Sequence, residues 1–333
     1  MPLPYLCITF HGSSHPDKYN NIWAYPLDNL EKDGIPILNT STLEKEVLLR
    51  ELRDFKWRPD GKLYVIVANK DNSKLLSFVK SSTPEPSFDF EKVFAKDKQG
   101  RPYDLQHPFQ MVFSPEGDIY VSSQNSNRVY RFFGSHSKEA GLPMPVPAHY
   151  ADLDLPMGTF IPSLLDAKQQ HKHQGLLKKV RGIGFGPDGN LYVADEKIPA
   201  VNVYDGHTGA FIKTLIGAKS FLKNYKFIPN HLMIKGDYLY VADRDNNCVY
   251  QMNVQQQTPF RLLIDRSDKK HTHAGGIQIA TINGRPTFLW GQRKKHKKSK
   301  LVSYSFNENE VGKSQSLLKK LEDEPEFIKV LDL

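Results

Sequence analysis

The chain has very few cysteines: Cys7 and Cys248 are the only two among 333 residues. Two thiols so far apart exclude a disulfide framework and are typical of a protein from a reducing compartment. The sequence also has no apolar run long enough to cross a membrane. The apolar run at the N-terminus stops at Phe10, which is short for a secretion signal. We therefore expect a cytoplasmic protein with no membrane partner.

Several catalytic motifs are also missing. The sequence contains no glycine-rich phosphate loop, no nucleophile elbow and no Cys-x-x-Cys pair. What it does have is an excess of positive charge, with 45 Lys and Arg against 37 Asp and Glu, which gives a formal net charge of +8. Such an excess favours anionic partners where the basic residues are clustered.

The most informative feature that is present is an internal repeat. Each copy has a short alternating apolar run, a tight turn that is usually Pro-Asp-Gly or Pro-Glu-Gly, and a second run such as Leu-Tyr-Val-Ala. Period-two alternation over so short a stretch predicts strands, and the Pro-x-Gly step predicts a turn between them. The four clearest copies are Phe55–Asn69, Met111–Gln124, Ile183–Glu196 and Leu232–Arg244.

A third and a fourth apolar run follow in each clear copy, so one unit contains four consecutive antiparallel strands. Two weaker units lie at the chain ends, and the first of these lacks its own first strand. We interpret Phe327–Leu333 as a fourth strand, Ser314–Asp323 as a short helix, and His149–Leu155 as the fourth strand of the third unit. Repeated four-stranded units predict an all-β, six-bladed β-propeller that forms a single domain over residues 1–333, closed by pairing of its N- and C-terminal segments.

The amino-acid sequence of the repeats resembles that of the NHL-repeat family. The segments that carry the resemblance are Pro187–Asp195 (PDGNLYVAD), Tyr238–Met252 (YLYVADRDNNCVYQM) and Gly117–Phe132. The resemblance implies a six-bladed propeller like those of amidating lyase, strictosidine synthase-like and gluconolactonase-like enzymes, and of NHL domains that bind RNA or proteins. A propeller hosts both enzymes and binding modules, so it does not decide between these functions.

Basic segments are expected on the face that carries the starts of the first strands. In a meander of four strands, this face also receives the loops that follow the second strands and those between units. We predict an anion-binding surface there and interpret residues 156–179 as a loop insertion over this basic face. The lysines that we assign to the anion-binding surface are Lys178, Lys179, Lys294, Lys295, Lys297 and Lys298.

Candidate catalytic residues lie where first strands begin and second strands end. Alignment of the repeats places Asp54, Gln110, Gly182, His231 and Gly276 at one equivalent position. Arg53 and Arg181 share the preceding position, where paired guanidinium groups would suit a carboxylate or phosphate. His11 ends a second strand of its unit. We predict His231, His11, Arg53 and Arg181 as catalytic residues.

Imidazoles that converge on one site can also hold a divalent metal with a water in an open position. We predict His107, His231 and His273 as the metal ligands. The resemblance to amidating lyase implies zinc held by histidines of inner strands, whereas gluconolactonase-like proteins imply calcium. No diagnostic metal-binding motif is shared with either.

Two functions follow from these patterns. The first is an enzyme of lyase, hydrolase or cyclase type, metal-assisted or acting by acid–base chemistry, which takes an anionic small molecule at the mouth of the central channel. The second is a non-catalytic binding module that recognises nucleic acid or an acidic protein through the basic face. The basic clusters contain few aromatic residues, which disfavours recognition by base stacking.

Overall fold

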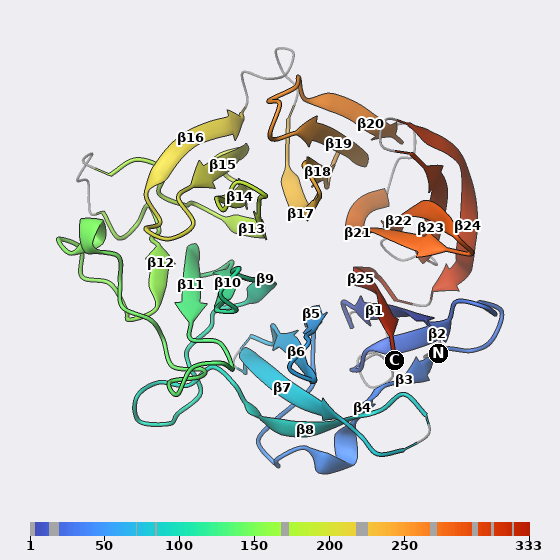
Figure 1. The fold of residues 1–333 in the computed structure, drawn as a ribbon, viewed down its shortest axis with the longest axis horizontal. Coiled ribbons are helices and arrows are strands. Elements are labelled where there is room, and N and C mark those ends of the chain that lie inside the picture. Colours follow the sequence, from blue (N-terminus) through green and yellow to red (C-terminus); the bar gives the residue numbers. More distant parts are fainter. Residues whose placement is uncertain are drawn as a thin grey trace. The chain divides into compact units, whose positions relative to one another are not determined.

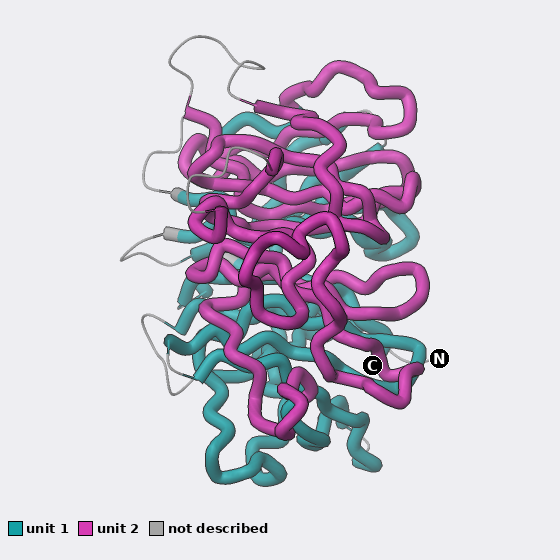
Figure 2. Tube along the Cα trace, turned by 90° about the vertical axis from the view of Figure 1, so that its left-hand side faces the viewer, with its two compact units in different colours: residues 1–93, 263–333 teal, residues 94–262 magenta. Residues whose placement is uncertain are grey.

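The computed structural model describes residues 4–12, 20–70, 72–83, 85–167, 173–217, 226–266, 272–294, 299–307, 310–321 and 323–333. These residues form 25 strands and two short 3-10 helices, Thr40–Thr42 and Ala148–Tyr150. The strands are arranged in six sheets built from antiparallel four-stranded meanders (Figure 1). They divide into two compact units, residues 1–93 with 263–333 and residues 94–262 (Figure 2).

Unit 1, residues 1–93 and 263–333, contains three of the sheets. Their strand orders are β25-β1-β2-β3, β5-β6-β7-β8 with the short β4 added beside β8, and β21-β22-β23-β24. The strands are β1 (Pro4–Phe10), β2 (Trp23–Pro26), β3 (Ile35–Pro36), β4 (Leu38–Asn39), β5 (Leu52–Trp57), β6 (Lys62–Val67), β7 (Lys74–Lys80), β8 (Phe88–Val93), β21 (Thr272–Ile282), β22 (Arg285–Lys294), β23 (Ser299–Phe306), β24 (Val311–Leu321) and β25 (Pro325–Asp332).

Unit 2, residues 94–262, contains the other three sheets, ordered β9-β10-β11-β12, β13-β14-β15-β16 and β17-β18-β19-β20. The last residues of β20 are assigned to unit 1. The strands are β9 (Pro108–Phe113), β10 (Ile119–Ser123), β11 (Arg128–Phe132), β12 (Thr159–Ile161), β13 (Val180–Phe185), β14 (Leu191–Asp195), β15 (Ala200–Tyr204), β16 (Phe211–Ile216), β17 (Pro229–Lys235), β18 (Tyr238–Asp243), β19 (Cys248–Asn253) and β20 (Arg261–Asp265).

Hydrogen bonds within the turn explain why the repeat contains Pro-Asp-Gly followed by a tyrosine. In the turn between β13 and β14, Gly189 adopts a φ of +75°, which a side chain would disfavour. Asp188 accepts hydrogen bonds from the backbone N–H of Asn190 at 3.2 Å and from the Tyr192 hydroxyl at 3.0 Å. The aspartate of the turn and the tyrosine of the following strand are therefore held together, and the same pair of contacts joins Asp60 to Lys62 and Tyr64 between β5 and β6.

The aspartates that end β14 and β18 also brace loops. Asp195 is fully buried and accepts hydrogen bonds from the backbone N–H groups of Lys178, Lys179, Lys197 and Ile198 at 2.6–3.2 Å. Its carboxylate joins the loop that precedes β13 to the loop that follows β14. Asp195 therefore stabilises the loop before β13, which carries Lys179, and the loop after β14, which begins with Glu196.

The sheets confirm the predicted fold class, an all-β propeller of six four-stranded antiparallel blades. The two chain ends share one sheet, where β25 pairs antiparallel with β1, from Pro4 opposite Asp332 to Ile8 opposite Ile328. This pairing confirms the predicted closure by the terminal segments. The buried side chains of Leu6 and Ile8 on β1 and of Ile328 on β25 belong to one hydrophobic core cluster.

Three details of the predicted strands are wrong. The segment Phe327–Leu333, apart from its last residue, lies in β25, which is the first strand of the N-terminal sheet rather than a fourth strand. The segment interpreted as a helix, Ser314–Asp323, lies largely in the long strand β24 because its residues complete the sheet beside β23. The fourth strand of the third unit is β12, and the expected strand at His149–Leu155 contains a 3-10 helix instead.

The predicted insertion at 156–179 includes β12. Its described part is tied to unit 2 by an isolated bridge between Ser163 and Leu177 and by an ion pair between Arg128 and Asp166. Ala167 and Leu176 pack with Tyr150 and Leu153 in a small apolar cluster. These contacts order both ends of the segment. Its position over the basic face stays a prediction.

Candidate functional site

Every first strand has an irregularity in register near its start. The shifts lie between Leu52 and Phe55 on β5 and between Val180 and Ile183 on β13, and equivalent shifts occur on β9, β17, β21 and β25. Bulges of this kind redirect side chains and are frequent at functional sites. The residues at these irregularities include Arg53, Asp54, Phe109, Gln110, Arg181, Asn230 and Glu326.

Two of the first strands carry glycine at the irregularity because a neighbouring backbone lies too close for a side chain. A Cβ on Gly182 would lie 2.5 Å from the Leu232 backbone nitrogen, and one on Gly276 would lie 2.6 Å from the Glu326 carbonyl oxygen. The equivalent Gln110 is buried and joins its neighbours by hydrogen bonds: its side chain donates to the Leu232 carbonyl and accepts from the Ile183 N–H. This aligned position is therefore a packing position in three of the repeats.

In unit 2, three cationic side chains converge on the carboxylate of Glu196, which directly follows β14. Arg181 Nε lies 2.6 Å from Glu196 Oε2, Arg244 Nη1 lies 3.2 Å from the same oxygen, and Lys179 Nζ lies 3.4 Å from Oε1. Arg181 also donates to the Gln124 side chain. We call Lys179, Arg181, Glu196 and Arg244 the Glu196 cluster.

The Glu196 cluster carries more positive than negative charge. Arg244 is also paired with Asp245 at 2.7 Å, so three cations face two carboxylates. Burial raises the pKa of Glu196, but Arg181 and Arg244 outweigh it, and the pKa lies below its ordinary value. Glu196 is therefore ionised at neutral pH and positions the cations; it does not serve as a proton donor there. The side chains of Lys179 and Arg244 remain 28% and 25% exposed.

Phe109 brings two of the predicted catalytic residues together. The Arg181 guanidinium carbon lies 5.2 Å from the centroid of the Phe109 ring, in the range of cation–π contacts. The His231 ring centroid lies 5.0 Å from the same phenyl ring. His231 is almost completely buried, whereas Arg181 has 12% of its side chain exposed.

In unit 1, the predicted catalytic residue Arg53 belongs to a second network, which we call the Glu326 cluster: Arg53, Arg293, Glu324 and Glu326. Arg53 Nη1 lies 2.5 Å from Glu326 Oε1, and Arg293 Nη1 lies 2.8 Å from the same oxygen. Arg293 also pairs with Glu324 at 2.5 Å. The Arg53 side chain is 4% exposed, and the carboxylate of Glu326 balances its positive charge.

His11 lies beside the Glu326 cluster, and its backbone N–H donates to the Glu324 carbonyl at 2.9 Å. Burial lowers the pKa of its imidazole; Glu326 raises it, while Arg53 and Arg293 lower it further. The pKa therefore lies below the ordinary value, and His11 is neutral at pH 7. A neutral imidazole can accept a proton, which is the property that a general base needs.

The predicted metal ligands are divided between the units. His107 and His231 belong to unit 2, whereas His273 is an exposed residue of β21 in unit 1. His107 has a φ of +54°, and its carbonyl accepts a hydrogen bond from the Gln124 N–H. Within the described part of the chain, no group of three or more His, Cys, Asp or Glu side chains could hold a metal ion. Binding of zinc or calcium by these histidines stays a prediction.

The predicted anion-binding lysines are only partly described. Lys178 is exposed, and Lys179 is the third cation of the Glu196 cluster. The backbone of Lys294 ends β22 opposite Thr272, but its side chain is outside the described set. Lys295, Lys297 and Lys298 lie outside the described residues. Across the ranges that the structure describes, no helix is long and apolar enough to cross a membrane.

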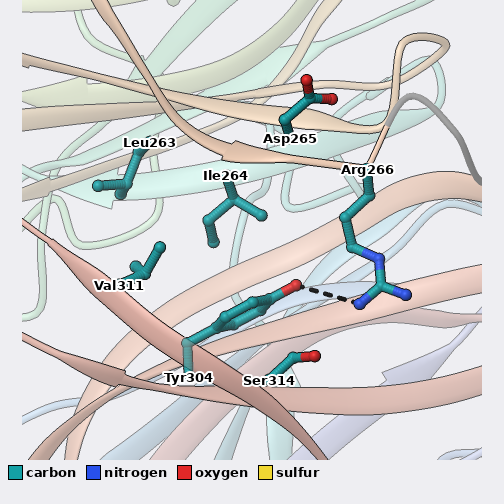
Figure 3. A pocket seen from close by; sticks show the side chains of 7 residues that line it. All are labelled: Leu263, Ile264, Asp265, Arg266, Tyr304, Val311 and Ser314. Carbon is teal, nitrogen blue, oxygen red and sulfur yellow. Dashed lines mark hydrogen bonds between the residues drawn. The ribbon is translucent and has the colours of Figure 1, made fainter.

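A cavity of about 300 Å³ lies elsewhere in unit 1, beside β23 and β24. Figure 3 shows the Arg266 side chain extending toward the Tyr304 hydroxyl, which Nη1 reaches at 3.4 Å, while Asp265 points away from the ring. Leu263, Ile264 and Val311 give the cavity an apolar wall. Burial raises the pKa of Tyr304, so its phenol is neutral. None of the described residues that we predicted for the site lines this cavity.

Sequence reasoning missed Glu196, Arg244 and Gln124 as members of the site. A signal was available, because all three hold the same place in the repeats, directly after the second strand (YVSSQ, YVADE and YVADR). An aligned position that carries an amide, a carboxylate and a guanidinium in successive copies predicts side chains that bond to one another.

No protein-family model matches the chain, and no curated protein is similar to it in sequence. Many solved structures share its fold. One from a nidogen/laminin complex has 13% identity and a TM-score of 0.59, and the alignment covers 98% of both chains. A putative 6-phosphogluconolactonase from Bacteroides uniformis has 11% identity and a TM-score of 0.55, with 95% of this chain and 81% of that chain covered.

A protein from Lactobacillus plantarum has 12% identity and a TM-score of 0.56, with coverage of 96% and 82%. At these identities the likeness concerns the fold alone. The chain is therefore a six-bladed β-propeller, and the narrower NHL resemblance is not confirmed.

Proposed function

We propose that the protein is a hydrolase-type enzyme that acts on a small anionic ester or lactone, which it binds at the Glu196 cluster. The observation that carries the proposal is the convergence of Lys179, Arg181 and Arg244 on a single buried carboxylate. The carboxylate fixes the three cations at the ends of strands, and their surplus charge attracts an anion. Guanidinium groups bind carboxylates and phosphates through paired hydrogen bonds.

His231 supplies the acid–base chemistry in this proposal. It shares the Phe109 ring with Arg181 and would accept a proton from the water that attacks the carbonyl carbon. The ester or lactone bond then breaks, and the leaving alkoxide takes the proton back from His231, which gives an acid and an alcohol from an ester and a hydroxy acid from a lactone. His231 is 2% exposed; contact with the substrate therefore requires movement of the side chains that cover it.

The likeness to the putative 6-phosphogluconolactonase suggests a first probe pair. 6-Phosphoglucono-δ-lactone is an anionic lactone, and glucono-δ-lactone is the same ring without the phosphate. We expect the protein to hydrolyse the phosphorylated lactone faster than buffer does and to prefer it to the neutral lactone, with the rate followed by base consumption at constant pH. Binding of the stable product, 6-phosphogluconate, is measured by calorimetry at low salt.

Two variants and one control test the assignment of the site. Arg244→Ala removes a partly exposed cation of the Glu196 cluster and should weaken binding of 6-phosphogluconate by about tenfold or more, as expected when a charge-assisted hydrogen bond is lost. His231→Gln should lower turnover with little change in binding. Arg101→Ala is the matched control, because Arg101 is a highly exposed residue of the same unit that pairs with Asp97, and it should change neither quantity.

The proposal is wrong if neither lactone is hydrolysed faster than in buffer and 6-phosphogluconate does not bind saturably. It is also wrong if binding occurs but Arg244→Ala leaves it unchanged. Metal assistance is examined in the same preparation by elemental analysis and by assays with added zinc or calcium. The predicted histidine site requires about one equivalent of metal that His231→Gln removes.

A further inference from the structure

A second group of charged residues lies on the first strands of two sheets of unit 1. Strand β5 carries Asp54 and Lys56 on one side, and β25, which packs against β5, carries Lys329. Asp54 is fully buried. Its Oδ1 lies 3.3 Å from Lys329 Nζ, and its Oδ2 lies 4.0 Å from Lys56 Nζ. The buried carboxylate is thus paired more closely with Lys329 than with Lys56.

Both lysines remain accessible although their carboxylate partner is not. The side chain of Lys56 is 28% exposed and that of Lys329 is 16% exposed. The Lys329 ammonium also lies 5.9 Å from the centroid of the Phe327 ring, which holds the chain of Lys329 in place. A small molecule can therefore reach the two amines, whereas Asp54 is fully buried and also accepts a hydrogen bond from the Phe55 N–H at 3.0 Å.

The charges around Lys56 disfavour its protonated form. The facing groups are Lys329, Asp54 and Arg58, so two cations outnumber one carboxylate. Burial lowers the pKa of Lys56 most, Lys329 lowers it further, Asp54 opposes both, and the resulting pKa is about 8. A lysine made less basic by burial and by a neighbouring cation is a nucleophile near neutral pH.

We infer that Lys56 is a nucleophilic amine that forms an imine with a small aldehyde or ketone bearing a phosphate or carboxylate group. This site is distinct from the Glu196 cluster of unit 2 and does not depend on the proposed hydrolase function. Lys329, held by Asp54, pairs with the anionic group of the ligand and places the carbonyl next to Lys56.

The chemistry balances without any oxidant or reductant. The neutral Lys56 amine adds to the carbonyl carbon and gives a carbinolamine. Loss of the carbonyl oxygen as water, with the two hydrogens of the amine, leaves the carbon–nitrogen double bond. The reaction is reversible, and only an added hydride donor makes the adduct permanent.

The test uses pyridoxal 5′-phosphate as the probe and sodium borohydride to trap the imine on the full-length protein. The initial rate of labelling at each lysine is read by peptide mass spectrometry. At pH 7, an amine with a pKa of about 8 is neutral about 300 times more often than one at 10.5. A Brønsted slope of roughly 0.5 reduces the gain in rate to about 20-fold. We therefore expect Lys56 to be labelled about 20 times faster than the exposed Lys138.

Two further comparisons separate this site from general lysine chemistry. Pyridoxal, which lacks the phosphate, should lose most of the preference for Lys56. Lys329→Met removes both the neighbouring cation and the partner of the phosphate, so labelling of Lys56 should slow and its pH midpoint should move upward. Lys138→Met is the matched control and should leave labelling of Lys56 unchanged.

The proposal is overturned if wild-type Lys56 reacts no faster than Lys138, a result that needs no variant to fold. It is equally overturned if Lys329→Met, shown to be folded by circular dichroism, labels at Lys56 as fast as the wild type with the same pH midpoint. Equal labelling rates with pyridoxal and pyridoxal 5′-phosphate would show that Lys56 does not select ligands with an anionic group, and would overturn that part of the proposal.

Discussion

Replacement of Glu196 by glutamine is the sharpest test of the way the cationic cluster is held. The substitution keeps the size of the side chain but removes the charge that Lys179, Arg181 and Arg244 share. In the variant, the three cations lose the negative charge that they share, and Arg244 keeps its pairing with Asp245. The loss of one charge should therefore affect the stability of unit 2 as well as its affinity for anions.

The magnitude follows from burial. Breaking a buried ion pair costs about 3–5 kcal/mol, whereas an exposed pair contributes roughly 0–1 kcal/mol. The Glu196 side chain is 8% exposed and its partners are 12–28% exposed. We therefore expect Glu196→Gln to lower the free energy of unfolding by about 2–3 kcal/mol. With about 2.1 cal/mol/K of unfolding entropy per residue, the melting temperature should fall by about 3–4 °C.

The stability that the Glu196 carboxylate contributes should depend on pH. The folded-state pKa of Glu196 is lowered below the ordinary 4.5, so its contribution to stability is present above that value. It is lost as the pH falls through the folded-state pKa. The difference between wild type and Glu196→Gln should accordingly be constant near neutral pH and shrink in acid.

Differential scanning calorimetry between pH 3.5 and 7.5 measures both effects. Glu139→Gln, the same change on an exposed residue of unit 2, is the matched control and should stay within about 0.5 kcal/mol of the wild type. The reasoning is refuted if the two variants lose equal stability at pH 7, or if the loss in Glu196→Gln does not shrink in acid.

Three other predictions concern packing, titration and surface charge. Gly182→Ala places a Cβ 2.5 Å from the Leu232 nitrogen and should cost about 1–3 kcal/mol in urea unfolding, whereas Gly184→Ala meets only the flexible end of Ile234 at 3.2 Å and should cost less. His11 is neutral when folded because its pKa is lowered from 6.5, so stability should fall as the pH drops below 6.5 towards the folded-state pKa, and His11→Gln should flatten this slope. Neutralising Lys294, Lys295, Lys297 and Lys298 together should lower the salt dependence of single-stranded RNA binding by about 3 in log–log slope if the basic surface binds nucleic acid.

Each of these three predictions has a clear contrary outcome. Equal costs for Gly182→Ala and Gly184→Ala would show that the first strands do not approach as closely as described. An unchanged pH slope in His11→Gln would assign that titration to another group. RNA retention that is the same with and without the four lysines would remove the binding-module alternative.

Much of the fold was predictable because its signals are local. Alternating apolar runs and Pro-Asp-Gly turns fix each hairpin without reference to the rest of the chain, as the Asp188 and Tyr192 contacts show. The errors fall where the pattern alone is ambiguous. The run FIKVLDL has the pattern of any strand, and only its pairing with β1 makes it a first strand. Ser314–Asp323 has polar and apolar residues at spacings that also suit a helix, and its pairing with β23 decides the matter.

The site was predictable in position but not in partners. Aligned repeats place Arg181 and His231 at the starts of β13 and β17, and the structure brings both to Phe109. Sequence reasoning assigned Arg53 to an incoming anion, whereas in the structure Arg53 is paired with the buried Glu326. Which carboxylate meets which guanidinium depends on the packing of neighbouring sheets, since Arg53 and Glu326 are far apart in the chain.

The sequence by itself determined the repeat, the four-stranded unit, the number of units and the pairing of the chain ends, because these depend on short-range periodicity and turn chemistry. Only the tertiary structure decided which charges cancel and which remain in excess. The ion pair of Arg181 with Glu196 joins β13 to the residue that follows β14. The ion pair of Lys329 with Asp54 joins β25 to β5, which belong to different sheets. Electrostatic interactions of this kind depend on distance and burial in space, which no local pattern encodes.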